Sequence, residues 1–295
     1  MKRLFPLGIC IAILLCFAAC VVADGPVSGT TQPAKTAGTT MTTEITFDIP
    51  AVAPPAAEQP AVDPIPPGQT QPPASPEVVS VVIPEGFTFY QIARRLEANG
   101  VCSEVDFTNA AQNYQIQSFP APINPGACYR LEGMLYPDTY DFYLGEDPSA
   151  VLRKMLNNYA NKSGLPDYNT LILASIIERE TRSSGHMAMV SSVFHNRLAQ
   201  GMRLQADATI AYVEGHIKQN PLVQNPGQYA ERYNTYKCPA LPAGPICSPG
   251  RLAIEAAKHP SQSDYLYYFF GKDETNHYTK TYDEHLAAIK LYGIG

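Results

Sequence analysis

The spacing of apolar residues along the chain predicts an ordered region that begins at residue 78. Residues 78–83 form a β-rich run, which predicts a strand, and residues 84–86, Pro-Glu-Gly, predict a turn after it. Apolar residues at helical spacing follow as far as residue 99, and a second helix is predicted from Ser103, whose hydroxyl and Asp106 match a capping pattern. The first ordered segment is therefore a strand followed by two helices.

The rest of the chain is predicted to be mainly helical, with one short antiparallel hairpin. In "RLEGMLYPDTYDF" strand-like aromatic pieces lie on either side of a turn at Pro137 and Asp138, and Asp147 followed by proline is a typical helix start. Near the carboxyl end, "DYLYYFF" and "HYTK" are predicted strands joined by the turn "GKDETN". Further helices are predicted at 148–163, 171–181, 187–200, from 208, at 249–258 with Ser248 as its cap, and at 282–292.

The strand, helix, helix order of residues 78–114 leaves two interpretations open. It is the plan of a small glycan-binding module of the LysM kind, and it equally fits a plain α+β lobe that packs on the larger helical part of the chain. Both interpretations give the chain an α+β fold.

Residues 1–23 are predicted to form an export signal or membrane anchor. Lys2 and Arg3 precede an uncharged and mostly apolar run of 20 residues, which is just long enough to span a hydrocarbon core of about 30 Å. Residues 21–23 also offer a small-residue cleavage site, and residues 17–20 form an imperfect lipoprotein box that ends at Cys20. We favour retention at the membrane, by an uncleaved helix or a lipid on Cys20, over free secretion. The catalytic part is then expected outside the cytoplasm.

Residues 24–77 are predicted to be a disordered spacer rich in Pro, Thr and Ala. They hold 12 of the 27 prolines and few large apolar residues, so they cannot bury enough surface to offset the entropy of ordering. One isolated alternation in this segment, "EITFDIP", hints at a strand.

Charge and cysteine content narrow the kinds of partner. The net charge is −6 and no Lys or Arg cluster follows the first three residues, which argues against nucleic acid. Four cysteines lie beyond the export segment, and four cysteines allow three pairings; we predict a disulfide between Cys238 and Cys247, which enclose a short proline-rich loop. No cysteine pair has tight zinc spacing, so no metal site is predicted.

Two glutamates follow the apolar run of "LILASIIERET". Residues two apart on a helix point about 200° from each other, so Glu178 and Glu180 cannot face one cleft and are not a retaining glycosidase pair. The small residues Ala174 and Ser175 share the stripe of Glu178, whereas large aliphatic residues lie beneath Glu180, whose acid would reach outward. The pattern leans towards Glu178 as a functional acid, although an ordinary surface acid near a helix end is the more frequent case for either residue.

Polar and aromatic residues after position 201 suit the binding of a sugar. Gln205 lies between apolar neighbours, where an amide can pair with hydroxyl or acetamido groups, and Asp207 can cap the helix that begins at the next residue. Tyr233 and Tyr236 flank an Asn-Thr pair beside the proline-rich loop. Aromatic faces next to an amide suit pyranose rings, while turn chemistry alone also explains Asn234.

Seven motifs in a fixed order resemble those of the YceG-like proteins, the MltG family of endolytic murein transglycosylases. The resemblance covers residue 78 to the carboxyl end. Ala240 and Ala243 stand where the family usually has Gly and Pro, and "ETNHYTK" replaces a more Gly-rich turn; these departures affect loop shape and leave the acid in place. The motifs are "EGMLYPDTY", "LASIIERET", "VFHNRL", "GMRLQADATIAY", "YNTY", "LPAGPICSPG" and "YDEH".

The resemblance implies a small LysM-like lobe, residues 78–130, and a mainly helical catalytic transglycosylase domain, residues 131–295. It implies an enzyme that acts on peptidoglycan glycan strands at the outer face of the cytoplasmic membrane, beside peptidoglycan synthases. It also implies that the first Glu of "IIERET", Glu178, is the single catalytic acid/base. Gln205, Asp207, Tyr233, Asn234 and Tyr236 become candidates for lining the cleft.

A lytic transglycosylase needs one carboxyl group and no cofactor. Under this hypothesis Glu178 gives its proton to the glycosidic oxygen between MurNAc and GlcNAc, and the carboxylate then takes the proton of the MurNAc C6 hydroxyl, which closes on C1 to give a 1,6-anhydro end. Two other hypotheses are a muramidase in which Asp207 or Glu132 activates water, and a non-catalytic glycan-binding protein.

Overall fold

The computed structural model describes residues 77–116, 124–181 and 183–295. The predicted export segment, the spacer with its "EITFDIP" strand, and Cys20 lie outside these residues. The described part is a mixture of helices with two small antiparallel sheets, so the fold is α+β, as predicted. No helix in the described ranges is long and apolar enough to cross a membrane.

The first sheet pairs strands that are far apart in the sequence. β1 (Val78–Ile83) runs antiparallel to β2 (Asp138–Tyr143), and α1 (Phe89–Ala98) and α2 (Glu104–Asn113) lie between them in the chain. The strand and both helices confirm the predicted elements. The boundary predicted at residue 130 falls between the two paired strands, so β1 is completed by a strand from the segment expected to belong to the larger domain.

α1 begins with a capping box and buries one face. The Thr88 side chain accepts a hydrogen bond from the Gln91 amide, and the Gln91 side chain accepts one from the Thr88 amide, which satisfies two free N–H groups of the first turn. On the buried face, the Phe89 ring stacks between Phe107 of α2 and Tyr129, with centroids 5.4 and 4.9 Å apart. These contacts join the two helices to the core.

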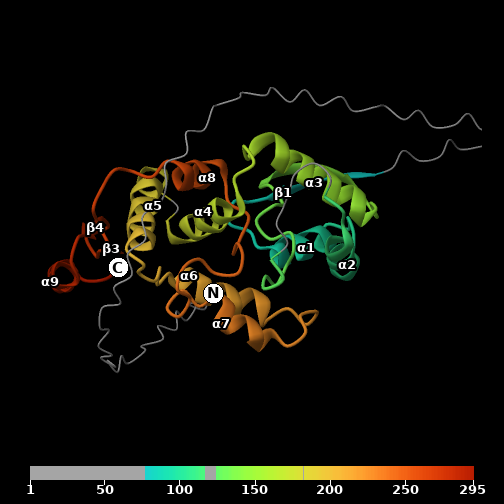
Figure 1. The fold of residues 1–295 in the computed structure, drawn as a ribbon. Coiled ribbons are helices and arrows are strands. Elements are labelled where there is room, and N and C mark those ends of the chain that lie inside the picture. Colours follow the sequence, from blue (N-terminus) through green and yellow to red (C-terminus); the bar gives the residue numbers. More distant parts are fainter. Residues whose placement is uncertain (1–76, 117–123, 182) are drawn as a thin grey trace, which may run out of the picture. The chain divides into compact units, whose positions relative to one another are not determined.

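The central helix of the larger part is α4 (Tyr168–Glu180). Its residues 171–178 are all buried, and it lies beside α5 (Ser184–Ala199) and α8 (Arg251–Lys258) (Figure 1). A helix that is apolar on every side must be surrounded by other elements, which is why the sequence carries an unbroken apolar run here. Further helical elements that precede α8 in the chain are α3 (Pro148–Lys162), α6 (Asp207–Tyr212), a π-helical turn η1 (Val213–Ile217), a 3-10 turn η2 (Pro226–Gln228) and α7 (Tyr229–Tyr233).

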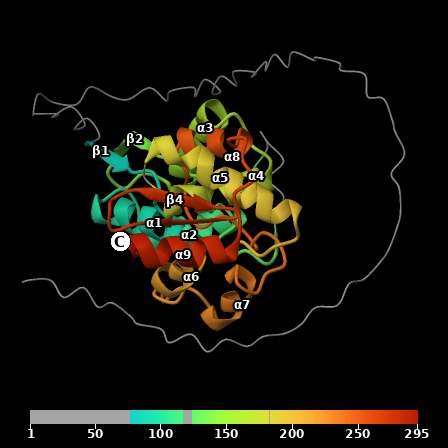
Figure 2. The ribbon, with the colours of Figure 1, turned by 90° about the vertical axis from the view of Figure 1, so that its left-hand side faces the viewer.

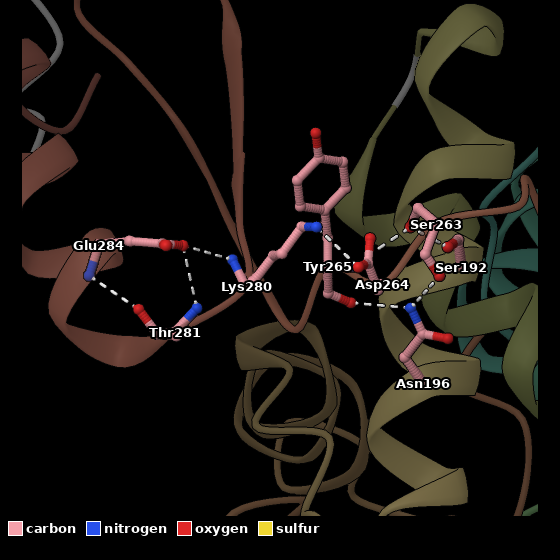
Figure 3. Close-up of polar contacts among 8 residues, drawn as sticks. All are labelled: Ser192, Asn196, Ser263, Asp264, Tyr265, Lys280, Thr281 and Glu284. Carbon is pink, nitrogen blue, oxygen red and sulfur yellow. Dashed lines mark hydrogen bonds and ion pairs between the residues drawn. The ribbon is translucent and has the colours of Figure 1, made fainter.

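The carboxyl-terminal elements confirm the predicted hairpin and helix. β3 (Tyr267–Phe270) pairs with β4 (Asn276–Thr279), and α9 (Tyr282–Tyr292) follows; Figure 2 shows them on the side facing the viewer. Asn196 of α5 donates hydrogen bonds to the carbonyls of Ser263 and Tyr265, at 2.8 and 3.0 Å, just before β3 (Figure 3). Beyond this anchor, Lys280 pairs with Asp264 at 2.7 Å on the surface.

Two predicted local features are wrong. The aromatic piece before Pro137 is not a strand but a series of turns, in which Gly133 has φ +82° and packs so closely that a Cβ would lie 2.8 Å from Pro245. Ser248 does not cap α8; the cap residue is Gly250, and no side chain caps it. In both cases residues distant in sequence contact the backbone: Pro245 packs against Gly133, and the backbone of Gly86 and Phe87 is bonded to Ser248.

Candidate functional site

Glu178 lies in the interior, between α4 and the segment that leads into α8. The residue is 8% exposed, and its carboxylate accepts a hydrogen bond from the Gly250 amide at 3.1 Å. Beneath it, the Ser175 hydroxyl accepts a hydrogen bond from the Ile246 amide at 3.0 Å. The small residues on this stripe therefore leave room for another backbone.

A cavity of about 640 Å³ opens beside Glu178. It lies between the turn after β1 and the facing ends of α4, α5 and α8. The Gly86 amide donates to the Ser248 carbonyl and the Ser248 amide donates to the Phe87 carbonyl, so the turn is fixed against the segment before α8. The lining residues are Pro84, Glu85, Gly86, Phe87, Gln91, Glu178, Arg179, Ser184, Met187 and Leu252.

Glu180 faces a different set of neighbours, which confirms that the two acids diverge. Its carboxylate accepts a hydrogen bond from the Tyr268 hydroxyl of β3 at 2.7 Å, and it is half-buried rather than reaching into solvent as the sequence suggested. Burial raises the pKa of Glu180 above its ordinary value, against the hydrogen bond from Tyr268. The negative charge of Asp207 raises this pKa further.

Three of the five predicted substrate contacts gather around Glu180. The Tyr236 hydroxyl donates to Asp207 at 2.6 Å, and Asp207 and Tyr236 both lie within electrostatic reach of Glu180. Gln205 joins this group through Arg197, whose guanidinium donates to the Gln205 side-chain oxygen at 3.1 Å. We call Glu180, Asp207, Tyr236, Gln205 and Arg197 the Glu180 cluster. None of the predicted substrate contacts lines the cavity beside Glu178.

The other two predicted contacts, Tyr233 and Asn234, form hydrogen bonds within the protein. Tyr233 is fully buried, and its hydroxyl accepts a hydrogen bond from the Cys128 amide at 3.3 Å. The Asn234 side chain accepts a hydrogen bond from the Tyr236 amide at 2.9 Å, which is a local turn contact. The ring of Tyr233 is thus covered by protein, and Asn234 orders the backbone that presents Tyr236.

Asp207 does not cap the helix that it was predicted to cap. α6 begins at Asp207 itself, its cap residue is Ala206, and no side chain caps it. The carboxylate binds the Tyr236 hydroxyl instead. This hydrogen bond joins segments 29 residues apart in the chain.

Glu132 is a third carboxyl group, enclosed in the core. It is 1% exposed, and its two oxygens accept hydrogen bonds from the Phe89 amide at 2.9 Å and the Tyr212 hydroxyl at 2.8 Å. Burial raises its pKa to about 8. Both carboxylate oxygens accept hydrogen bonds from protein groups, so Glu132 joins α1 to α6. It does not face a cleft in which it could activate water.

Arg197 and Tyr268 belong to the site, yet sequence reasoning did not single them out. Arg197 is 7% exposed and donates to the Leu204 and Leu266 carbonyls at 2.8 and 2.6 Å. An arginine inside the predicted apolar helix 187–200 is the signal that could have identified it, because arginine is rarely buried without partners. Nothing in the local pattern around Tyr268 distinguishes it from Tyr267, the other tyrosine of its strand.

The predicted disulfide is absent from the structure, in which all four described cysteines are free thiols. Cys247 is buried, with Sγ 3.3 Å from the Ser175 carbonyl oxygen. The Cys238 sulfur lies instead against the carbonyls of residues 231 and 232. The two side chains have separate surroundings.

A family model, curated relatives and a solved structure all match this chain. The sequence model of the YceG-like family matches residues 67–291. The chain is 34% identical to an endolytic murein transglycosylase of Bacillus subtilis (strain 168), over 57% of this chain and 50% of that protein. It is 30% identical to one of Streptococcus pneumoniae serotype 2, over 68% of this chain and 42% of that protein. The chain therefore spans about half the length of the curated relatives it matches, or less.

A solved structure is also similar. The crystal structure of a yceG-like protein from Listeria monocytogenes superposes with a TM-score of 0.59 at 31% sequence identity. The match covers 71% of this chain and 75% of that one.

Proposed function

Because the chain belongs to the YceG-like family, we propose that it is an endolytic murein transglycosylase. It would cleave the bond between MurNAc and GlcNAc within nascent glycan strands and leave 1,6-anhydroMurNAc ends. Support comes from the family match over residues 67–291 and from relatives that carry this name in two genera. The reaction needs one proton donor that later acts as a base.

We propose Glu180 as that acid/base. The observation that carries this assignment is the Glu180 cluster, in which a half-buried carboxyl with a raised pKa lies beside a second acid and a tyrosine. A raised pKa keeps a carboxyl protonated closer to neutral pH, as a general acid requires. Glu178 stays the second candidate, because the resemblance of "IIERET" favoured it and a cavity of about 640 Å³ opens beside it.

The proposed steps follow from the neighbours of Glu180. The protonated carboxyl gives its proton to the glycosidic oxygen as the bond to C1 breaks, and the resulting carboxylate is stabilised by the Tyr268 hydroxyl. The same carboxylate then takes the proton of the C6 hydroxyl, whose oxygen closes on C1. Tyr236 and Gln205 would hold the sugar so that this hydroxyl is near C1, the advantage of an intramolecular reaction.

A hydrolase is the second candidate function, and one observation favours it. Asp207 lies within electrostatic reach of Glu180, so a second carboxylate that could activate water is close to the proposed acid. The bond from Tyr236 occupies one oxygen of Asp207. In the transglycosylase reaction Asp207 would instead raise the pKa of Glu180 and activate no water.

Mass spectrometry of digested peptidoglycan separates these functions. We expect 1,6-anhydroMurNAc ends from the wild-type chain and loss of product with Glu180→Gln. If the digested fragments carry reducing ends instead, the chain is a hydrolase and not a transglycosylase. A protein that binds glycan strands and releases no fragment would be a non-catalytic binding protein.

We further propose that β1, α1, α2 and β2 form a LysM-like lobe and that residues 1–23 hold the enzyme at the outer face of the cytoplasmic membrane. The support is the antiparallel pairing of β1 with β2 around two helices, and the apolar run that follows Lys2 and Arg3. Peptidoglycan synthases would be its neighbours there. Membrane fractionation of wild type and Cys20→Ala tests retention: release of the variant alone would identify a lipid anchor.

A further inference from the structure

A second concave surface adjoins the cavity beside Glu178. This further cavity has a volume of about 380 Å³, and it shares Phe87 and Gln91 with the first, so the two adjoin at these side chains. We call the two cavities together the charged groove. Its combined size is in the range that holds a ligand of several residues.

The two ends of the charged groove differ in charge. The far end is lined by Arg94 and Arg95 and by no acid, whereas Glu85 and Glu178 line the near end, with Arg179 beside them. Such a groove is suited to a ligand that carries both signs of charge.

Acids lie within electrostatic reach of two cationic groups of the groove, Glu104 of Arg94 and Glu132 of Arg179, but neither acid forms an ion pair with them. Among the described residues no ion pair involves Arg94, Arg95 or Arg179. Arg95 lies 4.9 Å over the Phe87 ring and Arg94 lies 5.6 Å over the Tyr90 ring, so aromatic faces position both. Arg95 also donates to the Val82 carbonyl at 3.1 Å and Arg179 to the Gly86 carbonyl at 3.4 Å. A guanidinium group has five N–H donors, so each of the three keeps donors for a carboxylate.

Glu85 is the corresponding anion. It is exposed at the mouth of the groove and makes no ion pair with any side chain in the part of the chain that the structure describes. Its carboxylate lies over Gly250, where an added Cβ would be 1.9 Å from the Glu85 oxygen. The glycine therefore leaves space for Glu85 at this position.

We propose that the charged groove binds the stem peptide attached to the glycan strand. This rests on the proposed function, because only a murein strand presents such a peptide to the enzyme. In a peptide-bearing strand the lactyl carboxyl of MurNAc is held in an amide, so the sugars carry no negative charge to pair with the three guanidinium groups. A stem peptide carries several carboxylates and, on its diamino acid, one primary amine. The arginines take the carboxylates, and Glu85 takes the amine.

The position of the groove gives the contact a role in substrate choice. Glu178 and Arg179 line the groove, and Glu180, the last residue of the same helix, faces a different side, towards Tyr268. A peptide held there ties its own MurNAc residue to the end of α4, where the proposed acid lies. The enzyme then prefers strands that still carry peptides over strands from which peptides have been removed.

Binding of a free peptide tests the groove. The probe is N-acetyl-L-alanyl-γ-D-glutamyl-L-lysine, and the analogue with norleucine for lysine lacks the amine. We expect the paired change Arg94→Gln with Arg95→Gln to weaken binding of both peptides at least tenfold, and Glu85→Gln to weaken only the lysine peptide. Arg153→Gln, an exposed arginine of α3 outside the groove, is the matched control and should bind as wild type. Equal affinities in all variants, with unchanged circular dichroism, would overturn the proposal.

Cleavage by the wild-type chain separates this proposal from the proposed function. The substrates are peptide-bearing strands and the same strands after an amidase has removed the peptides. We expect kcat/KM to be at least tenfold higher for the peptide-bearing strands. Equal cleavage of both would refute the groove as a peptide site and leave the transglycosylase intact. If neither strand is cut, the proposed function fails, and the peptide isotherms alone decide whether the groove binds.

Discussion

At the scale of single residues, the end of α4 presents two acids to different surroundings. Glu178 is enclosed and bound to the Gly250 amide, whereas Glu180 is half-buried and bound to the Tyr268 hydroxyl. The raised pKa and the polar neighbours of Glu180 are properties of a general acid. The contribution of each acid to the reaction can be measured by replacing one of them at a time.

Replacing Glu180 by glutamine should lower kcat by about 10² to 10⁴, the usual contribution of a general acid. Glutamine keeps an acceptor for Tyr268 and cannot donate the proton to the leaving oxygen. The measurement is the rate of anhydro-end release from purified strands. Glu178→Gln is the paired variant, and a larger loss there than in Glu180→Gln would transfer the acid role to Glu178.

The pH profile of kcat should respond to Asp207. A general acid is active while protonated, so kcat falls as pH rises through the raised pKa of Glu180. Asp207→Asn keeps an acceptor for Tyr236 and removes the charge that raises this pKa, so the alkaline fall should move to lower pH. An unshifted profile in Asp207→Asn would mean that the titrating group is not Glu180.

Glu132 should make stability depend on pH. Its pKa rises from 4.5 to about 8 in the folded chain, so the folded state binds the proton more tightly than the unfolded state. The free energy of unfolding therefore falls between pH 4.5 and about 8, by on the order of a few kcal/mol. Urea titrations across this range should show a flatter dependence in Glu132→Gln, and the same slope as wild type in the exposed control Glu214→Gln.

At the scale of elements, the β3–β4 hairpin and α9 depend on an anchor at their start. α9 has no buried residue, and the hairpin has few, so these elements gain little from burial. Asn196 of α5 fixes the entering strand by two hydrogen bonds to main-chain carbonyls (Figure 3). Because β3 carries Tyr268, this anchor also positions a partner of Glu180.

Asn196→Ala should therefore destabilise the chain by about 1 to 3 kcal/mol, since two carbonyls lose their donor. Urea unfolding measures the change. Asp264→Asn, which removes the exposed partner of Lys280, is the control and should leave the unfolding midpoint unchanged at physiological salt. Equal effects of the two changes would contradict the role given to Asn196.

At the scale of the whole molecule, hydrogen bonds join α1 and the turn after β1 to the larger helical part. The Glu132 carboxylate accepts from the first amide of α1, and the turn after β1 is bonded through its backbone to the segment before α8. The charged groove lies along this junction. These contacts stabilise the chain without a covalent bond between the described cysteines.

Reducing agent should accordingly leave the melting temperature unchanged. Cys247 is enclosed against Ser175, and Cys238 faces other carbonyls, so no bond closes the proline-rich loop. Thermal unfolding with and without dithiothreitol, together with the intact mass, measures this. A lower melting temperature in dithiothreitol and a mass two hydrogens lighter before reduction would restore the predicted Cys238–Cys247 disulfide.

The sequence by itself determined most of the helices and strands and the divergence of the two acids, but neither the turns before Pro137 nor the short helix α7. Strands, helices, the hairpin and most helix starts depend on periodicity and on neighbours within a few residues, and both are visible in one chain. The angle between Glu178 and Glu180 follows from helix geometry alone.

Only the tertiary structure decided what surrounds each acid. Tyr268 approaches Glu180 from a strand 88 residues away, and Asp207 meets Tyr236 instead of capping its own helix. Tyr233, which the sequence suggested for sugar binding, is covered by the core. Burial and the distance between charges are set by long-range packing, and these quantities determine a pKa and access to substrate. Neither burial nor the distance between charges can be derived from the local sequence pattern.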